Sequence, residues 1–172
     1  PEAKVYAFEP NPAQYDICWN ISQNYPNISV EQLAIGEING PCKFFITIGN
    51  IGASSTLEPL DVPFGTSNQY HEVSATMFRL DYWLKKNNID KVDILWMDTQ
   101  GIELMALRGM GDYLKKVKFI HCEAAEKSYY KGHILKPELE EYLKSIGFSV
   151  SFHTPAYHPY GEGDIIATNM NI

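Results

Sequence analysis

The sequence predicts one α/β domain with a mostly parallel sheet and an antiparallel strand at its C-terminal end, and three observations lead to this prediction. Extended apolar runs alternate with segments of helical spacing. The run at 92–97 is almost continuously apolar, which is typical of a strand buried on both faces, and 117–124 is expected to be a further buried strand, interrupted by His121. The last two expected strands, 148–152 and 164–168, are joined without a helix, so they should pair antiparallel. The 172 residues suit a single domain, 1–172.

The first elements are expected in the order strand, helix, strand. Asn11 is a good helix N-cap, and Pro12 suits the first helical position. The apolar spacing after Pro12 indicates a helix that ends before Pro26. The elements expected in this half are a strand at 4–8, a helix at 12–24, and strands at 28–35, 43–48 and 73–78.

Residues 49–72 have a different composition from the rest of the chain. Gly, Ser, Thr, Asn and Pro dominate there, and no periodicity remains. Long loops in compact domains are usually functional. We therefore expect a long loop at 49–72, with a surface excursion as the structural alternative.

The second half contains the clearest helices. Pro137 opens an amphipathic segment, and Gly147 closes it. Gly109 is expected to cap an earlier helix at its C-terminal end. Helices are expected at 81–88, 102–107 and 137–146.

Charge and cysteine content narrow the class of protein. Fourteen basic residues against twenty-one acidic ones give a net charge of −7, and only Arg79 and Arg108 are arginines. Such a chain does not bind nucleic acid through bulk charge. No apolar stretch is long enough for a membrane span. Three cysteines without Cys-x-x-Cys spacing predict no zinc site and a reducing compartment, hence a cytoplasmic protein.

Three predicted strands end in an acid: Glu9, Asp98 and Glu123. Ligands of open α/β sheets bind beyond the carboxyl ends of the strands. A carboxylate after the first strand can accept both hydroxyls of a ribose. The structural alternative is that each acid caps a following helix, and for any one acid alone both interpretations stay open.

Two segments carry a resemblance to a known family. Residues 5–12, VYAFEPNP, resemble the second-strand motif of the FkbM family of S-adenosylmethionine-dependent methyltransferases. Residues 93–104, DILWMDTQGIEL, followed by Leu-Arg-Gly at 107–109, resemble its most recognisable segment. The Leu80-Asp81 pair and Gly147-Phe148 fit the same pattern, so the resemblance spans nearly the whole chain.

The resemblance implies a fold and a cofactor. The fold would be the Rossmann-like sheet of class I methyltransferases, and the cofactor would be S-adenosyl-L-methionine. The implied cofactor-binding residues are Glu9 at the ribose with Pro10 and Asn11 beside it, Ala34 and Ile35 at the adenine, and Asp98 and Gln100 at the methionine end. The family's first strand and glycine-rich loop are missing before Lys4, so we expect the C-terminal portion of a longer chain.

The implied reaction is O-methylation of a hydroxyl on a sugar, glycan or small metabolite, which requires a general base. The candidates for the base are Asp98, Glu123 and His71. His153 and His158, in the late loop, are as well placed as His71, whereas His121 lies in the middle of a strand and is more often a core residue. We expect 49–72 to be a lid over the acceptor site. Tyr129 and Tyr130 could stack on a sugar ring or simply pack. A metal-assisted reaction using Asp98 and Glu123 stays open, although no local ligand pattern requires a metal.

Two other classes of function compete with this interpretation. One is a non-catalytic binding or interaction domain on a degenerate methyltransferase scaffold. The other is a dinucleotide-dependent dehydrogenase, which needs a Gly-x-Gly-x-x-Gly turn that these residues lack.

Overall fold

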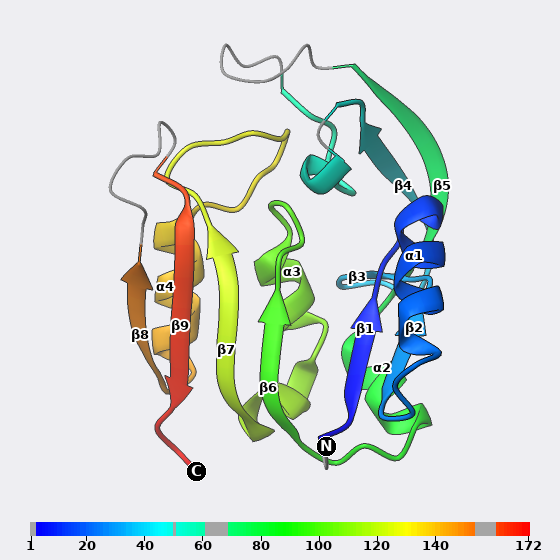
Figure 1. Cartoon of the computed structure of the whole chain (residues 1–172). Coiled ribbons are helices and arrows are strands. Elements are labelled where there is room, and N and C mark those ends of the chain that lie inside the picture. The colour runs from blue at the N-terminus through cyan, green and yellow to red at the C-terminus, as the bar shows by residue number, and fades with distance from the viewer. Residues whose placement is uncertain (1–2, 50, 61–68, 154–160) are drawn as a thin grey trace.

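The computed structural model describes residues 3–49, 51–60, 69–153 and 161–172, which form a mixed α/β arrangement with three sheets (Figure 1). The strands are β1 (Val5–Phe8), β2 (Ile28–Glu31), β3 (Ala34–Ile35), β4 (Gly40–Thr47), β5 (Tyr70–Phe78), β6 (Val92–Met97), β7 (Val117–Ala124), β8 (Phe148–His153) and β9 (Gly163–Asn169). The helices are α1 (Pro12–Ser22), α2 (Leu80–Lys86), α3 (Glu103–Arg108) and α4 (Lys136–Ser145), with short 3-10 turns η1 (Ile51–Ala53) and η2 (Gly111–Lys116).

The strands pair in both directions. The three sheets have the orders β1-β2, β3-β5-β4 and β6-β7-β9-β8. Pairing is parallel for β1–β2, β3–β5 and β6–β7, and antiparallel for β4–β5, β7–β9 and β8–β9. The expected antiparallel pair at the C-terminal end is therefore confirmed. One mostly parallel sheet is not confirmed, because the described strands form three sheets of mixed direction.

Pairing between strands also moved the expected element boundaries. Thr47 of β4 lies opposite Tyr70 of β5, so the last three residues of the 49–72 segment belong to a strand. The strand expected at 28–35 is two strands, because β2 pairs with β1 whereas β3 pairs with β5. Residues 61–68 of the expected loop lie outside the described residues.

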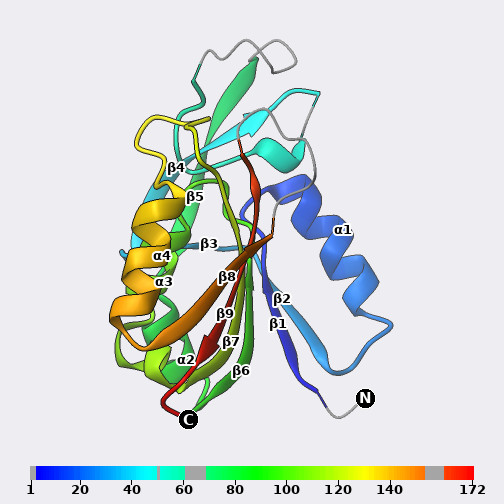
Figure 2. The same cartoon turned by 90° about the vertical axis from the view of Figure 1, so that its left-hand side faces the viewer.

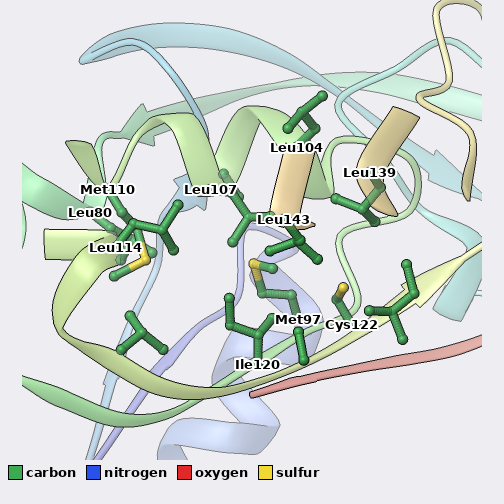
Figure 3. Packing of buried hydrophobic residues seen from close by; sticks show 14 of the residues in the cluster. Leu80, Met97, Leu104, Leu107, Met110, Leu114, Ile120, Cys122, Leu139 and Leu143 are labelled. Carbon is green, nitrogen blue, oxygen red and sulfur yellow. The ribbon is translucent and has the colours of Figure 1, made fainter. Parts of the chain in front are cut away.

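The main core lies between the sheet β6-β7-β9-β8 and the helices α2, α3 and α4. Figure 3 shows leucines of α3 and α4 packed over Met97, Ile120 and Cys122 of the strands. Ile120 and Cys122 are two positions apart on β7, and Met97 of β6 lies opposite Cys122, so the three side chains share one face of the sheet. No helix among the described residues combines the length and apolarity needed to cross a membrane.

The opposite face of the same sheet carries exposed apolar side chains. In Figure 2, α1 lies on the other side of the sheets from α2, α3 and α4. Strand alternation places four exposed side chains on the face away from the core: Ile94, Trp96, Phe119 and Ile166. Trp96 is 72% exposed although it lies on a strand beside the core. We call these four residues the open face.

Two strand edges next to each other have no described partner. β1 pairs only with β2, and β6 pairs only with β7, within the described residues. Figure 1 shows β1 and β6 neighbouring each other, with their arrows pointing the same way. The rings of Tyr6 and Phe8 on β1 contact Trp83 of α2, with centroids 5.1 and 4.9 Å apart. Trp83 belongs to the same core cluster as Met97 at the end of β6, so α2 underlies both edges.

Candidate functional site

A sharp turn joins β6 to α3 and presents the side chains that follow the strand. Gln100 has a φ of 54° and Gly101 a φ of 99°. Glycine adopts this left-handed conformation readily, whereas for Gln100 it requires support from the surroundings. Glu103, 2% exposed, provides part of that support, because its Oε2 accepts the N–H of Gly101 at 3.1 Å.

Gln100 bridges two carboxylates at the carboxyl ends of β6 and β7. Its Nε2 donates to Oδ1 of Asp98 and to Oε2 of Glu123, both at 2.6 Å. The two strands are parallel neighbours, with Met97 opposite Cys122, so the residues that follow them meet at one edge. The structure thus brings together three of the residues expected in the site.

The surroundings of Glu123 favour its protonated form. Burial raises the pKa of its carboxyl group to about 9, and the negative charges of Asp98 and Glu162 act in the same direction. Glu162 also forms a hydrogen bond with the Glu123 carboxyl group. At neutral pH Glu123 is therefore an uncharged hydrogen-bonding group beside Asp98.

The described part of the 49–72 segment lies against the turn and against residues 129–131. The hydroxyl of Ser55 donates to the carbonyl oxygen of Gln100 at 2.7 Å. Pro59 forms an isolated β-bridge with Tyr130, and the N–H of Leu60 donates to the carbonyl oxygen of Tyr129 at 2.7 Å. Hydrogen bonds thus hold the described part of this segment against the turn that carries Gln100 and against Tyr129 and Tyr130.

A small cavity opens beside the bridged carboxylates. Its free space of about 10 Å³ is enough for about one water molecule. His133 is one of its walls; burial lowers the pKa of its imidazole, and its Nδ1 accepts the N–H of Tyr129 at 3.1 Å. The imidazole is therefore neutral, with its proton on Nε2. The lining residues are Gln100, Gly101, Glu103, Glu123, Ala124, Ala125, Tyr129, His133 and Glu162.

The residues expected around the ribose and adenine do not line this cavity. Glu9 follows β1, and its Oε1 accepts the N–H of Asn11 at 2.7 Å. Burial raises the pKa of Glu9, and this hydrogen bond opposes the shift. Asn11 caps α1 through the N–H of Ala13, as the sequence predicts. Ala34 and Ile35 are buried on β3, so they offer little surface to a ligand.

Of the histidines expected as bases, those among the described residues do not line the cavity. His71 lies on β5 opposite Ile46, exposed, and not in the loop where the sequence placed it. His121 stacks beneath Trp96 with ring centroids 4.2 Å apart, and its buried Nδ1 has no partner among the described residues. His153 ends β8, and His158 lies outside the described residues.

Some residues of the site were not anticipated from sequence. His133, Glu162 and Ser55 come from three loops, and no motif joins them. The one feature they share is that each lies in a loop, and loop position alone does not identify a site residue in the sequence. Across the ranges that the structure describes, no group of three or more His, Cys, Asp and Glu side chains is arranged to hold a metal ion.

Comparisons with known proteins place the chain in a family. The family model described as "Methyltransferase FkbM domain" matches residues 1–150. The chain is 25% identical over 181 aligned positions to the 2-O-methyltransferase NoeI of Sinorhizobium fredii (strain NBRC 101917 / NGR234), covering 100% of this chain and 72% of that protein. No solved structure matches. The family match spans most of the 172 residues, and the chain belongs to the FkbM methyltransferase family.

Proposed function

We propose that this protein transfers a methyl group from S-adenosyl-L-methionine to a hydroxyl group of a sugar, glycan or small metabolite. The observation that carries the proposal is the bridge from Gln100 to Asp98 and Glu123 beside the cavity. Membership of the FkbM family supports methyl transfer, and the 2-O-methyltransferase relative supports oxygen as the acceptor atom.

The cofactor would bind along the carboxyl ends of β1 and β6. Glu9 uses Oε1 for the N–H of Asn11, and no hydrogen bond within the described residues uses Oε2, so this oxygen suits a ribose hydroxyl. Pro10 and Asn11 fix the chain next to Glu9, and Ala34 and Ile35 would form an apolar floor. When bound, S-adenosylmethionine supplies an electrophilic methyl group on a sulfonium.

The acid pair would receive the proton that the acceptor hydroxyl loses. Glu123 retains its own proton at neutral pH, so Asp98 is the candidate base of the pair. Gln100 holds the Asp98 carboxylate through Nε2 and limits its rotation. His133, neutral with a proton on Nε2, would donate a hydrogen bond to an acceptor oxygen.

The cavity has room for about one water molecule, which suits a single hydroxyl group of an acceptor. Carboxyl, amide and imidazole groups surround the cavity, and Tyr129 presents an aromatic ring beside them. Aromatic rings and hydrogen-bonding groups together suit sugars, which have both apolar faces and hydroxyl edges. The free cysteines Cys18, Cys42 and Cys122 support a reducing, cytoplasmic setting.

The neighbouring edges of β1 and β6, which have no strand partner within the described residues, support one further proposal about the fold. A single parallel strand between them would join two of the sheets into one Rossmann-like sheet of the class I methyltransferase type. A segment outside these 172 residues would supply that strand together with the glycine-rich loop. The same open edges favour the alternative function, a binding domain that does not catalyse.

Methyl transfer from labelled S-adenosylmethionine to a panel of neutral saccharides tests the proposal. Asp98→Asn should lower kcat by about 100- to 10,000-fold, the usual contribution of a general base. Asp112→Asn, on an exposed residue paired with Lys115, is the matched control and should keep full activity. The proposal would be contradicted if the folded wild-type chain failed to bind S-adenosylhomocysteine both alone and together with the segment that supplies the proposed strand.

A further inference from the structure

The amide of Gln100 has two different ends, and its orientation decides what the acid pair meets. The Nε2 end donates to Asp98 and Glu123, so both of its protons are used. The Oε1 end points the other way, toward the hydroxyl of Tyr130 at 2.6 Å. If the amide rotated by half a turn, its acceptor Oε1 would face the acceptor Oδ1 of Asp98 and the bridge would be lost.

Tyr130 is the donor that holds the Oε1 end. Its hydroxyl has one proton and two acceptors within reach, Gln100 Oε1 at 2.6 Å and the carbonyl oxygen of Ala53 at 2.9 Å. The Ala53 oxygen already accepts the hydroxyl of Thr47 at 3.0 Å. Within the described residues Gln100 Oε1 accepts from Tyr130 alone. The shorter distance and the lack of another donor assign the proton to Gln100.

The hydroxyl of Tyr130 is held in place from several directions. The side chain is 4% exposed, and burial with the surrounding acids raises the pKa of its phenol, so it stays protonated as a donor. The β-bridge to Pro59 fixes its backbone. Ser55, 1% exposed, holds the Gln100 backbone at the carbonyl oxygen. The side chain and the backbone of Gln100 are thus fixed by two separate loops.

We infer that Tyr130 is a positioning residue that acts through Gln100, keeping the amide nitrogen turned toward Asp98 and Glu123. Its effect on methyl transfer rests on the function proposed above, whereas its effect on the amide does not. The role differs from ring stacking on a sugar, because it uses the hydroxyl group and not the face of the ring. It also links the described part of the 49–72 segment to the acid pair, since the β-bridge from Pro59 holds the backbone of Tyr130.

A double-mutant cycle separates this role from simple packing. Tyr130→Phe removes only the hydroxyl, and Gln100→Met removes the amide at similar volume. One ordinary hydrogen bond corresponds to a loss of about 3- to 10-fold, so Tyr130→Phe should lower kcat by that factor, with the KM for the cofactor unchanged. In the Gln100→Met background, Tyr130→Phe should cause no further loss of kcat. Tyr142→Phe, on α4, is the control and should leave kcat unchanged.

A second measurement needs no substrate. The side-chain NH₂ signals of ¹⁵N-labelled Gln100, assigned by their disappearance in Gln100→Met, should be sharp and resolved in the wild type. In Tyr130→Phe they should broaden or collapse toward free-amide positions. The melting temperature of Tyr130→Phe shows that its fold is kept. In the control variant Tyr142→Phe the Gln100 signals should stay as in the wild type. Unchanged Gln100 signals in Tyr130→Phe, or equal losses of kcat in both backgrounds, would overturn the inference. If no form transfers methyl but the signals change as expected, the positioning role stands and the proposed reaction fails.

Discussion

Thr99 donates two hydrogen bonds to the same carboxylate oxygen of Glu103. Its Oε1 accepts the N–H of Thr99 at 2.9 Å and the hydroxyl of Thr99 at 3.0 Å. A buried carboxylate with backbone donors stabilises the turn that carries Asp98 and Gln100, although burial raises its pKa. The second acid of the Asp-x-Gln-Gly-x-Glu motif therefore lines the cavity and also holds the turn through its hydrogen bonds.

Glu103→Gln should lower the free energy of unfolding by about 1–3 kcal/mol, because an amide offers one acceptor oxygen where three donors need two. Its NH₂ group would also face the N–H of Thr99 or Gly101. Urea denaturation measures the loss. Glu140→Gln, on an ion pair with Lys144 at the surface of α4, is the control and should change stability by less than about 0.5 kcal/mol. Equal losses in the two variants would show that Glu103 does not support the turn.

The pH dependence of stability should report the proton on Glu123. In the folded state its pKa is about 9, above the ordinary value of 4.5, so between these values the folded chain binds a proton that the unfolded chain has released. The free energy of unfolding therefore falls as pH rises through this window. Glu123→Gln, which imitates the protonated form, should reduce that slope. Denaturation series from pH 4.5 to about 9 measure it.

Asp93→Asn is the matched control for this slope. Lys118 lowers the pKa of the Asp93 carboxyl group below 3.8, so its contribution to stability is lost only as pH falls through more acidic values. The slope between 4.5 and about 9 should stay as in the wild type. A slope that is the same in Glu123→Gln as in Asp93→Asn would mean that Glu123 is ionised in the folded protein at neutral pH.

Strand positions could be predicted well from the sequence, because apolar runs bounded by acids or turn residues leave few alternatives. The strand at 92–97 and the strand at 117–124 match β6 and β7 at both ends. Where pairing decides the boundary, prediction from one sequence was less exact. Tyr70 belongs to β5 because it lies opposite Thr47, which no local pattern reveals.

The site could be predicted only in its motif-bearing half. Asp98 and Gln100 follow β6, and Glu123 lies near the end of the neighbouring parallel strand β7, so strand order was enough to bring them together. His133 and Glu162 reach the cavity through loop conformations that depend on the folded chain. His71 was expected in a loop, but strand pairing placed it on β5. Tertiary pairing thus decides which histidine reaches the acids.

Glu9→Gln should weaken binding of S-adenosylhomocysteine by roughly 10- to 150-fold, the usual worth of hydrogen bonds to a charged group. The amide keeps one oxygen but loses the second acceptor expected for the ribose. Titration calorimetry measures the change. Glu31→Gln is the matched control, because Glu31 ends the neighbouring strand β2 directly opposite Phe8, and it should bind like the wild type. Equal affinities of the two variants would place the ribose elsewhere.

Trp83 and Trp96 should differ sharply in what their removal costs. Trp83 is 5% exposed and contacts β1 and the main core, so Trp83→Ala should lower the free energy of unfolding by about 3–5 kcal/mol. Trp96 is 72% exposed on the open face, so Trp96→Ala should cost less than about 1 kcal/mol in these 172 residues.

The same Trp96→Ala substitution also tests the strand proposed between β1 and β6. A polypeptide that supplies this strand and packs on the open face would bury Trp96, and the substitution would then cost several times more, as expected for a large buried side chain. Denaturation of both forms, with and without the added segment, measures the difference. A cost that stays below about 1 kcal/mol in the extended form would mean that the added segment leaves the open face uncovered. A high cost in the 172-residue chain itself, falling on dilution, would instead show that two copies cover the face for each other.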